Sequence, residues 1–224
     1  MKHRLKPYLF SRGEYIFHDF LLKDHKRGWE NPHGITFERF KSADYKCLEN
    51  TLSDIDHWER LFTVEEVRAR IDDGHRFYVA KKNDDIIGYF WLAVNSIGIS
   101  FFNGTIHLKP GEALSFNALI KKEYRGKGIF NRLKAFAFND LIQNGFHRVV
   151  GFYWHKNQAS IRMNERFGSR IIGKVKYYHL LSLAFRWHNL AVDKIDFDGG
   201  VLIFWKKLIR KVFRKIKEAT AAEG

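Results

Sequence analysis

The stretch KKEYRGKGIFNRLKAF, residues 121–136, places Gly126 and Gly128 two residues apart, directly before an amphipathic run. The backbone N–H groups in the first turn of a helix have no partners inside the helix, and the helix dipole adds positive potential there. Glycine lacks the Cβ that would keep a phosphate away from the backbone. Because Arg125 and Lys127 add positive charge, the stretch is predicted to bind a diphosphate group through its main-chain amides.

Two common phosphate-binding motifs do not fit this stretch. The dinucleotide-binding pattern G-x-G-x-x-G requires a third glycine, and Asn131 stands at that position. A P-loop requires Ser or Thr after Gly-Lys, and Gly128 stands there. The spacing of the glycines alone therefore leaves the ligand open.

The longer segment ALIKKEYRGKGIFNRL resembles the pyrophosphate-binding segment of the GNAT superfamily of N-acetyltransferases. In that family a splayed strand leads to a turn R/Q-x-x-G-x-G/A, followed by Ile or Leu and a helix. Here the turn runs from Glu123 to Ile129, with Glu in place of the first Arg or Gln. The resemblance implies that the turn binds the pyrophosphate of coenzyme A, and that Ile120, with Leu119 beside it, meets the pantetheine arm.

A second segment, NQASIRMNERFGS, agrees with this resemblance through Asn157, Ser160 and the pair Phe167–Gly168. In the family the Asn side chain binds near the pantetheine, and the preceding strand lies beside the acyl-donor slot. The resemblance covers about residues 35–185. It implies that acetyl-CoA is the acyl donor and that no metal ion takes part. The implied coenzyme A-binding residues are Leu119, Ile120, Arg125, Gly126, Lys127, Gly128, Ile129, Phe130, Asn157 and Ser160.

The sequence departs from the family at the acid that protonates the leaving thiolate. Many members have Tyr seven residues after the Asn, whereas this chain has Asn164, whose amide has no proton to give at neutral pH. Asn164 is expected to be a solvated helix residue. The other candidates for the acid are Tyr153, His155, Tyr177 and Tyr178.

Acetyl transfer to an amine requires a neutral amine, so a general base or a water path to one is needed. The resemblance implies direct attack on the thioester, without a covalent enzyme intermediate. Two residues are expected as candidates for the base. Glu112 begins the strand that leads to the glycine turn, and His155 ends the strand on the other side of the donor slot.

The acceptor is expected to be the primary amine of a small molecule, such as an amino sugar or a membrane-linked precursor. It is expected to bind near the first two helices and the 95–111 connection. Two alternatives stay open: acetylation of a protein lysine or N-terminal amine, and a non-catalytic module that binds acyl-CoA. A longer acyl chain is also compatible with the Phe-rich strands.

The elements that must position these residues follow from periodicity and turn signals. Their order predicts a mixed α+β fold with a mostly antiparallel central sheet flanked by helices. Two short strands with a turn near Arg12–Gly13 are expected in an N-terminal extension (1–34), which precedes an acyltransferase domain (35–190) and a basic C-terminal segment (191–224). Strands are expected at 35–41, 76–82, 86–95, 112–120, 148–154 and 170–187, and helices at 43–52, 63–71, 126–144 and 157–167.

The composition limits the classes of protein to which the chain can belong. The chain has 224 residues, of which 45% are hydrophobic, so a sizeable core is expected. Its single cysteine, Cys47, excludes an internal disulfide and favours a reducing compartment. No signal peptide or membrane-spanning run of apolar residues is recognised, so a cytoplasmic location is expected.

Residues 202–218 hold seven Lys and Arg residues against Glu218, which is about half of the chain's net charge of +14. Residues 202–218 alternate apolar and basic side chains at helical spacing, which is typical of a helix that lies on an anionic membrane surface. Peripheral contact with the inner face of the membrane is therefore a hypothesis. No nucleic-acid partner is expected, because no comparable basic stripe occurs elsewhere.

Overall fold

The computed structural model describes residues 10–24, 34–41, 44–54, 63–83, 85–99, 104–180, 183–188 and 196–198. They divide into two compact units. The larger unit comprises the described residues within 17–95 and 108–171, and the smaller unit comprises those within 1–16, 96–107 and 172–224.

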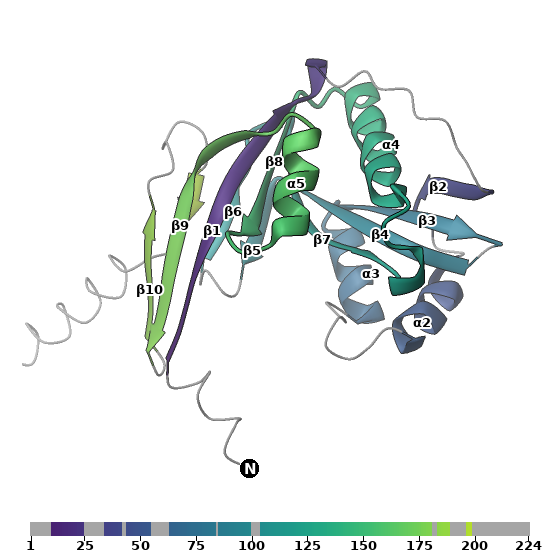
Figure 1. The fold of residues 1–224 in the computed structure, drawn as a ribbon, viewed down its shortest axis with the longest axis horizontal. Coiled ribbons are helices and arrows are strands. Elements are labelled where there is room, and N and C mark those ends of the chain that lie inside the picture. Colours follow the sequence, from purple (N-terminus) through teal and green to yellow (C-terminus); the bar gives the residue numbers. More distant parts are fainter. Residues whose placement is uncertain are drawn as a thin grey trace, which may run out of the picture. The chain divides into compact units, whose positions relative to one another are not determined.

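The larger unit contains a six-stranded sheet in the order β1-β8-β7-β4-β3-β2 (Figure 1). Its strands are the second part of β1 (Phe10–Leu21), β8 (Arg148–Trp154), β7 (Glu112–Ile120), β4 (Asp85–Val94), β3 (Arg76–Lys82) and β2 (Ile35–Arg39). The pairs β2–β3, β3–β4 and β4–β7 are antiparallel, and β7–β8 is parallel. The predicted mixed, mostly antiparallel sheet is therefore confirmed.

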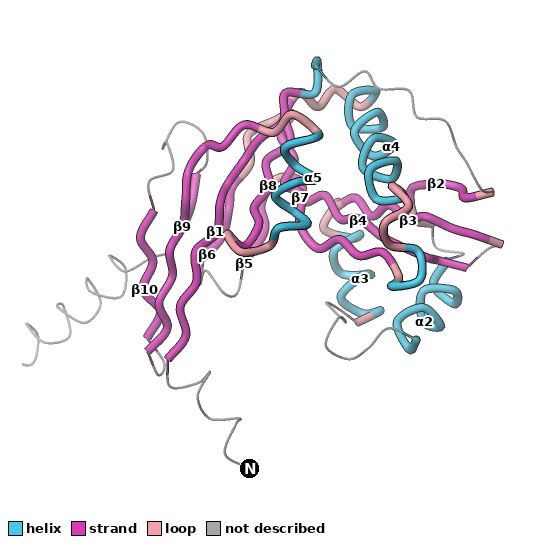
Figure 2. The backbone as a smooth tube through the Cα atoms, in the orientation of Figure 1, coloured by secondary structure: helices cyan, strands magenta, loops and turns pink. Residues whose placement is uncertain are grey.

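Helices cover both faces of this sheet. Figures 1 and 2 show α4 on one face of β2–β4, with α2 and α3 on the other. The helices are α2 (Tyr45–Asp54), α3 (Val64–Asp72), α4 (Ile129–Gln143) and α5 (Gln158–Arg166), with short 3-10 helices at Leu22–Asp24 and Lys122–Tyr124. A capping box starts α3: Glu66 N–H donates to Thr63 Oγ1 (3.3 Å), and Thr63 N–H donates to Glu66 Oε2 (2.8 Å).

The apolar stripe of α4 packs against the sheet and forms much of the core. The helical spacing of Ile129, Leu133, Phe136, Ala137 and Leu141 in the sequence predicts one apolar stripe. Four of these residues are buried, whereas Phe136 is 36% exposed. Burial of this stripe against β2, β3 and β4 fixes the start of the helix beside the end of β7.

The segment expected to be an N-terminal extension contributes a strand to the main sheet. Residues 10–21 form one continuous strand, β1, so the expectation of two short strands with a turn near Arg12–Gly13 is wrong. A Cβ on Gly13 would lie 2.5 Å from ring atom Cε1 of Tyr177, so this glycine makes room for a ring and does not form a turn. Farther along β1, Phe17 and Phe20 are fully buried.

The smaller unit contains short antiparallel pairings. β9 (Arg170–Leu180), which starts in the larger unit, pairs with β10 (Leu183–His188). β6 (Gly104–His107) pairs with β5 (Ser96–Ile99) and with β11 (Asp196–Asp198).

The basic segment 202–218 lies outside the described residues. Of the helices that the structure does describe, none combines the length and the apolar character needed to cross a bilayer.

Candidate active site: a cavity between diverging strands

The parallel strands β7 and β8 are paired at one end only. Their register runs from Glu112–Arg148 to Ser115–Gly151 and stops there. β7 continues to Ile120 against β4, where the register shifts so that Phe90 lies opposite Ala118 and Trp91 opposite Phe116. The residue in between, Asn117, has a positive φ of 39°. This bulge adds twist and turns β7 away from β8.

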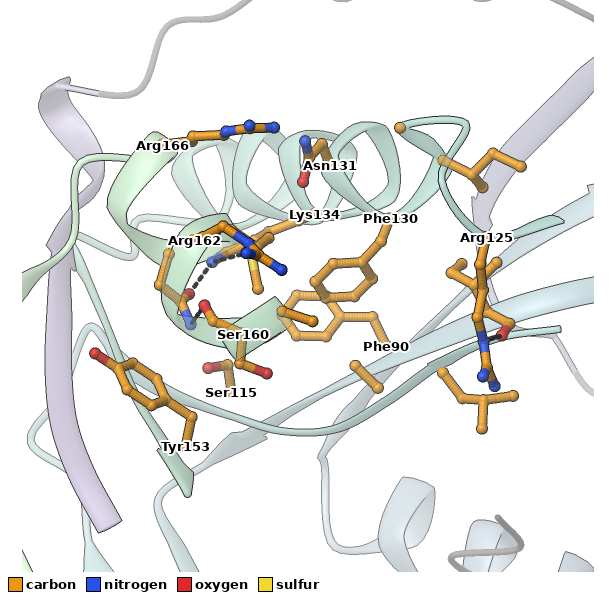
Figure 3. A pocket seen from close by; sticks show the side chains of 18 of the residues that line it. Phe90, Ser115, Arg125, Phe130, Asn131, Lys134, Tyr153, Ser160, Arg162 and Arg166 are labelled. Atoms are coloured by element: carbon orange, nitrogen blue, oxygen red, sulfur yellow. Dashed lines mark hydrogen bonds between the residues drawn. The ribbon is translucent and has the colours of Figure 1, made fainter. Parts of the chain in front are cut away.

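A cavity of about 640 Å³ opens where the two strands separate. Its walls come from the second half of β7, the glycine turn, the first turns of α4, the end of β8 and one face of α5. Figure 3 shows the rings of Phe90 and Phe130 between Arg125 at one end and Lys134 at the other. The cavity thus has two basic ends and an apolar middle, which suits an elongated ligand with polar groups at both ends.

The glycine turn forms the first end of the cavity. Gly126 and Gly128 have positive φ angles of 78° and 71°, a conformation that favours glycine. The helix begins at Ile129, three residues later than predicted, because Gly128 is its N-cap. Arg132 is the first residue of α4 whose N–H meets a backbone carbonyl, that of Gly128 (3.3 Å).

The backbone amides of this turn are therefore available to a ligand. Among the described residues, none accepts a hydrogen bond from the N–H groups of residues 126–131. A Cβ on Gly126 would meet no atom within 4 Å, so the space in front of the turn is open. Successive free amides at a helix N-terminus fit a diphosphate such as that of coenzyme A.

The basic side chains of the turn hold its shape. Arg125 Nε donates to the carbonyl of Ile120 (2.8 Å), and Lys127 Nζ donates to that of Glu123 (3.0 Å). Arg132 Nη1 donates to the carbonyl of Lys127 (3.1 Å). Arg125 and Lys127 are exposed and Arg132 is half-buried, and all three add positive potential to this end of the cavity.

The structure brings most of the predicted coenzyme A-binding residues together. Those that line the cavity are Leu119, Ile120, Arg125, Gly126, Gly128, Ile129, Phe130 and Ser160. Lys127 and Asn157 do not line it. Asn157 is instead the N-cap of α5, and its side chain accepts a hydrogen bond from Ser160 N–H (3.1 Å). It acts on the cavity by fixing the start of the helix that carries Ser160.

Neither predicted general base lines the cavity. Glu112 is 6% exposed, and its carboxylate accepts from Arg148 Nη1 (2.7 Å) and from Lys109 N–H (3.1 Å). Arg148 Nε also donates to Asp19 (2.9 Å), which makes a buried network. His155 follows β8, with its ring 5.9 Å from that of Trp154. The placement of Glu112 favours a structural role and argues against its use as the base.

The prediction that Asn164 is a solvated residue is wrong. It is 4% exposed and lines the cavity. Its Nδ2 donates to the carbonyl of Ser160 (2.9 Å), and its Oδ1 accepts from Lys134 Nζ (2.9 Å). The amide is buried because α5 turns this face toward α4, which the sequence of α5 alone does not reveal.

Lys134 is the main cavity residue that sequence reasoning missed. It is 2% exposed, and burial lowers the pKa of its ammonium well below the ordinary value. A signal was present: Lys134 shares the helical stripe of Ala137, Phe138 and Leu141, at i+3, i+4 and i+7, all of which are buried. A lysine on such a stripe is expected to face the core.

His18 enters the same cavity from β1. Its ring stacks on Tyr153 (centroids 5.2 Å apart), and its Nδ1 has no hydrogen-bond partner among the described residues. Burial, followed by the charge of Lys134, lowers the pKa of His18 to about 3. Burial also raises the pKa of Tyr153, with a smaller contribution from Glu165. Both side chains are therefore neutral near pH 7.

Comparison with known proteins agrees with this geometry. Residues 37–169 match the model of the acetyltransferase (GNAT) family. No curated protein matches the chain. The described residues contain no group of three or more side chains suited to hold a metal ion.

Solved structures share the fold. A GCN5-related N-acetyltransferase from Sphaerobacter thermophilus has a TM-score of 0.52 at 16% identity, over 84% of this chain and 55% of that one. A protein described as a GNAT-family acetyltransferase from Novosphingobium aromaticivorans has a TM-score of 0.52 at 14% identity, over 74% and 63%. A conserved protein of unknown function from Staphylococcus epidermidis has a TM-score of 0.51 at 16% identity, over 78% and 64%. The chain thus spans less than two thirds of the length of each of these three.

Proposed function

Because the chain belongs to the acetyltransferase (GNAT) family, we propose that it transfers an acetyl group from acetyl-CoA to the primary amine of a small molecule. The observation that carries this proposal is the row of unpartnered amides at residues 126–131, which faces a cavity between two separating strands. The amides would hold the diphosphate of coenzyme A. The apolar middle of the cavity would take the pantetheine arm, which places the thioester near the point where β7 and β8 part.

The chemistry is direct attack. The acceptor nitrogen forms a bond to the thioester carbonyl carbon, the carbon–sulfur bond breaks, and the sulfur leaves as the thiol of coenzyme A. The acceptor must first lose a proton, because amines are largely protonated near neutral pH. Neither Glu112 nor His155 lines the cavity, so we propose that water reached through its open side carries this proton away.

Two experiments test the proposal. Titration calorimetry with acetyl-CoA and with coenzyme A measures binding, and we expect heat from both. Release of free thiol from acetyl-CoA is then followed with amino sugars, amino acids, polyamines and lysine-containing or free N-terminal peptides. Thiol release with a small amine supports the proposal, whereas release with peptides alone supports a protein acetyltransferase.

A non-catalytic module that binds acyl-CoA is the second candidate function. It is favoured by Asn164, which stands where many family members have the tyrosine acid. Binding of coenzyme A without thiol release on any amine would support this module. Absence of binding would overturn both candidates.

A role at the membrane is a separate proposal. It rests on the amphipathic basic sequence of residues 202–218. The intact chain is expected to sediment with anionic liposomes more strongly than a chain that lacks residues 202–224. Equal partition of the two chains would remove the membrane from the proposed function.

A further inference from the structure

Lys134 is a buried lysine whose partners are all neutral. Its Nζ donates to Asn164 Oδ1 (2.9 Å) and approaches Met163 Sδ (3.6 Å). The ring centroids of Phe20, Phe167 and Phe138 lie 3.9, 4.7 and 5.4 Å from the same nitrogen. Among the described residues, no carboxylate lies within ion-pair distance of it.

The groups that face Lys134 from the neighbouring elements supply no negative charge. His18 on β1 is neutral, because its pKa is lowered to about 3. On α5, Asn164 is an amide and Arg162 is a cation that also lines the cavity. Glu165, whose charge contributes to the raised pKa of Tyr153, is exposed on α5.

A buried charge without a counterion is costly, and aromatic rings and one amide offset only part of that cost. Lys134 also lines the cavity, so an anion that enters there would supply the negative partner that its ammonium group lacks. The glycine turn already supplies donors for the diphosphate at the other end of the cavity, where Figure 3 shows Arg125 beyond the rings of Phe90 and Phe130. The anion expected at the Lys134 end is therefore a different group of the same ligand.

We propose that the ammonium group of Lys134, held by Asn164, protonates the sulfur of coenzyme A as the acyl group leaves; this assignment rests on the proposed function. The acceptor nitrogen bonds to the carbonyl carbon, and the electron pair of the breaking carbon–sulfur bond passes to sulfur. Sulfur takes a proton from Lys134 Nζ, which becomes a neutral amine. The proton lost by the acceptor leaves to water, and Lys134 recovers a proton from water.

Burial also makes Lys134 a better proton donor. It lowers the pKa of the Lys134 ammonium, which is therefore a stronger acid than that of an exposed lysine. Asn164 has no proton to give, but its amide oxygen fixes the group that does.

The test measures the thiol of bound coenzyme A and needs no acceptor. Titration calorimetry between pH 6 and 9.5 compares coenzyme A with desulfo-coenzyme A, in which hydrogen replaces the SH group. If Lys134 contacts the sulfur, the bound thiol has a pKa about one unit below that of the free thiol, equivalent to ~10-fold tighter binding of the thiolate. The ratio of the two dissociation constants then changes up to ~10-fold as the pH rises.

Variants assign this effect to Lys134. Lys134→Met is expected to lose the pH dependence of the ratio while still binding desulfo-coenzyme A, and Lys134→Arg is expected to retain part of it. Lys46→Met, which removes an exposed positive charge on α2, is the matched control and should leave the ratio unchanged.

Each outcome decides the proposal. If the thiol bound to the unmodified protein titrates as it does in free solution, the assignment is overturned whether or not the variants fold. If Lys134→Met keeps the pH dependence, another group stabilises the thiolate and the assignment is again overturned. If neither coenzyme A nor acetyl-CoA binds at all, the proposed function fails first.

Discussion

Ser115 and Gly151 form the last registered pair of the parallel strands β7 and β8, and the candidate active site opens directly beyond them. A Cβ on Gly151 would lie 2.4 Å from Ser115 Oγ and 2.7 Å from His18 Cε1. Three strands therefore meet at this point, and side chains of two of them fill the space that a Cβ on Gly151 would need. The branching of the sheet and the close approach of His18 to the cavity depend on the same residue.

Gly151→Ala is expected to destabilise the protein and to disturb the cavity. Overpacking of this kind costs about 1–3 kcal/mol, because the buried side chains of Ser115 and His18 must move to admit the methyl group. Urea denaturation measures the loss. Gly98→Ala is the control, since a Cβ there meets no atom within 4 Å. Equal stability of the two variants would contradict the close contact at Gly151.

Gly128→Ala is expected to weaken coenzyme A binding more than tenfold. An alanine at φ 71° is strained by about 1–2 kcal/mol, and relief of that strain would turn the amides of the next residues away from the diphosphate. Calorimetry with coenzyme A measures the effect. Gly145→Ala is the matched control, because Gly145 has a φ of 80° and open space around it at the other end of α4. It should lose stability but keep affinity.

Arg148→Met is expected to lower the free energy of unfolding by about 3–5 kcal/mol, because it leaves the buried carboxylates of Asp19 and Glu112 without their shared partner. Lys174→Met, which breaks a half-exposed pair with Glu14 (3.5 Å), should cost less than ~1 kcal/mol. Urea denaturation at pH 7 compares the two. Similar losses would show that the buried network contributes no more to the free energy of unfolding than an exposed ion pair does.

Glu112→Gln separates a structural role from a catalytic one. If Glu112 only holds Arg148, the variant loses stability, while the pH profile of thiol release keeps its shape. A general base would instead remove the acidic limb of that profile when replaced. The rate of thiol release between pH 6 and 9, measured with the best amine from the panel, distinguishes these outcomes.

His18 is expected to make stability fall as the pH is lowered from 6.5 toward 3. The unfolded chain takes up a proton on this histidine near pH 6.5, whereas the folded chain does so only near pH 3. Between these values the unfolded state binds more protons, so the free energy of unfolding declines by up to about 1.4 kcal/mol per pH unit. His18→Gln should show a shallower decline in denaturation measured from pH 7 to 4. Parallel curves for both proteins would contradict the buried neutral histidine.

Local sequence was enough to predict the features that depend on neighbouring residues. The pattern TVEE at residues 63–66 predicts a capping box, and the structure confirms it, because its hydrogen bonds span only three residues. The glycine turn before α4 is also confirmed, although the helix starts three residues later than predicted. Predicting the start at Gly126 overlooked that both glycines adopt positive φ, which is incompatible with a right-handed helix.

The sequence by itself determined the order of most elements, the glycine turn before α4 and, through the resemblance, the family. Only the tertiary structure decided that β1 joins the main sheet, that Arg148 donates a hydrogen bond to Glu112, and that Lys134 donates one to Asn164 beside the cavity. The physical reason is the range of the interactions. A turn or a cap is fixed by backbone geometry within a few residues, whereas the burial of a charge depends on side chains that packing brings from distant segments.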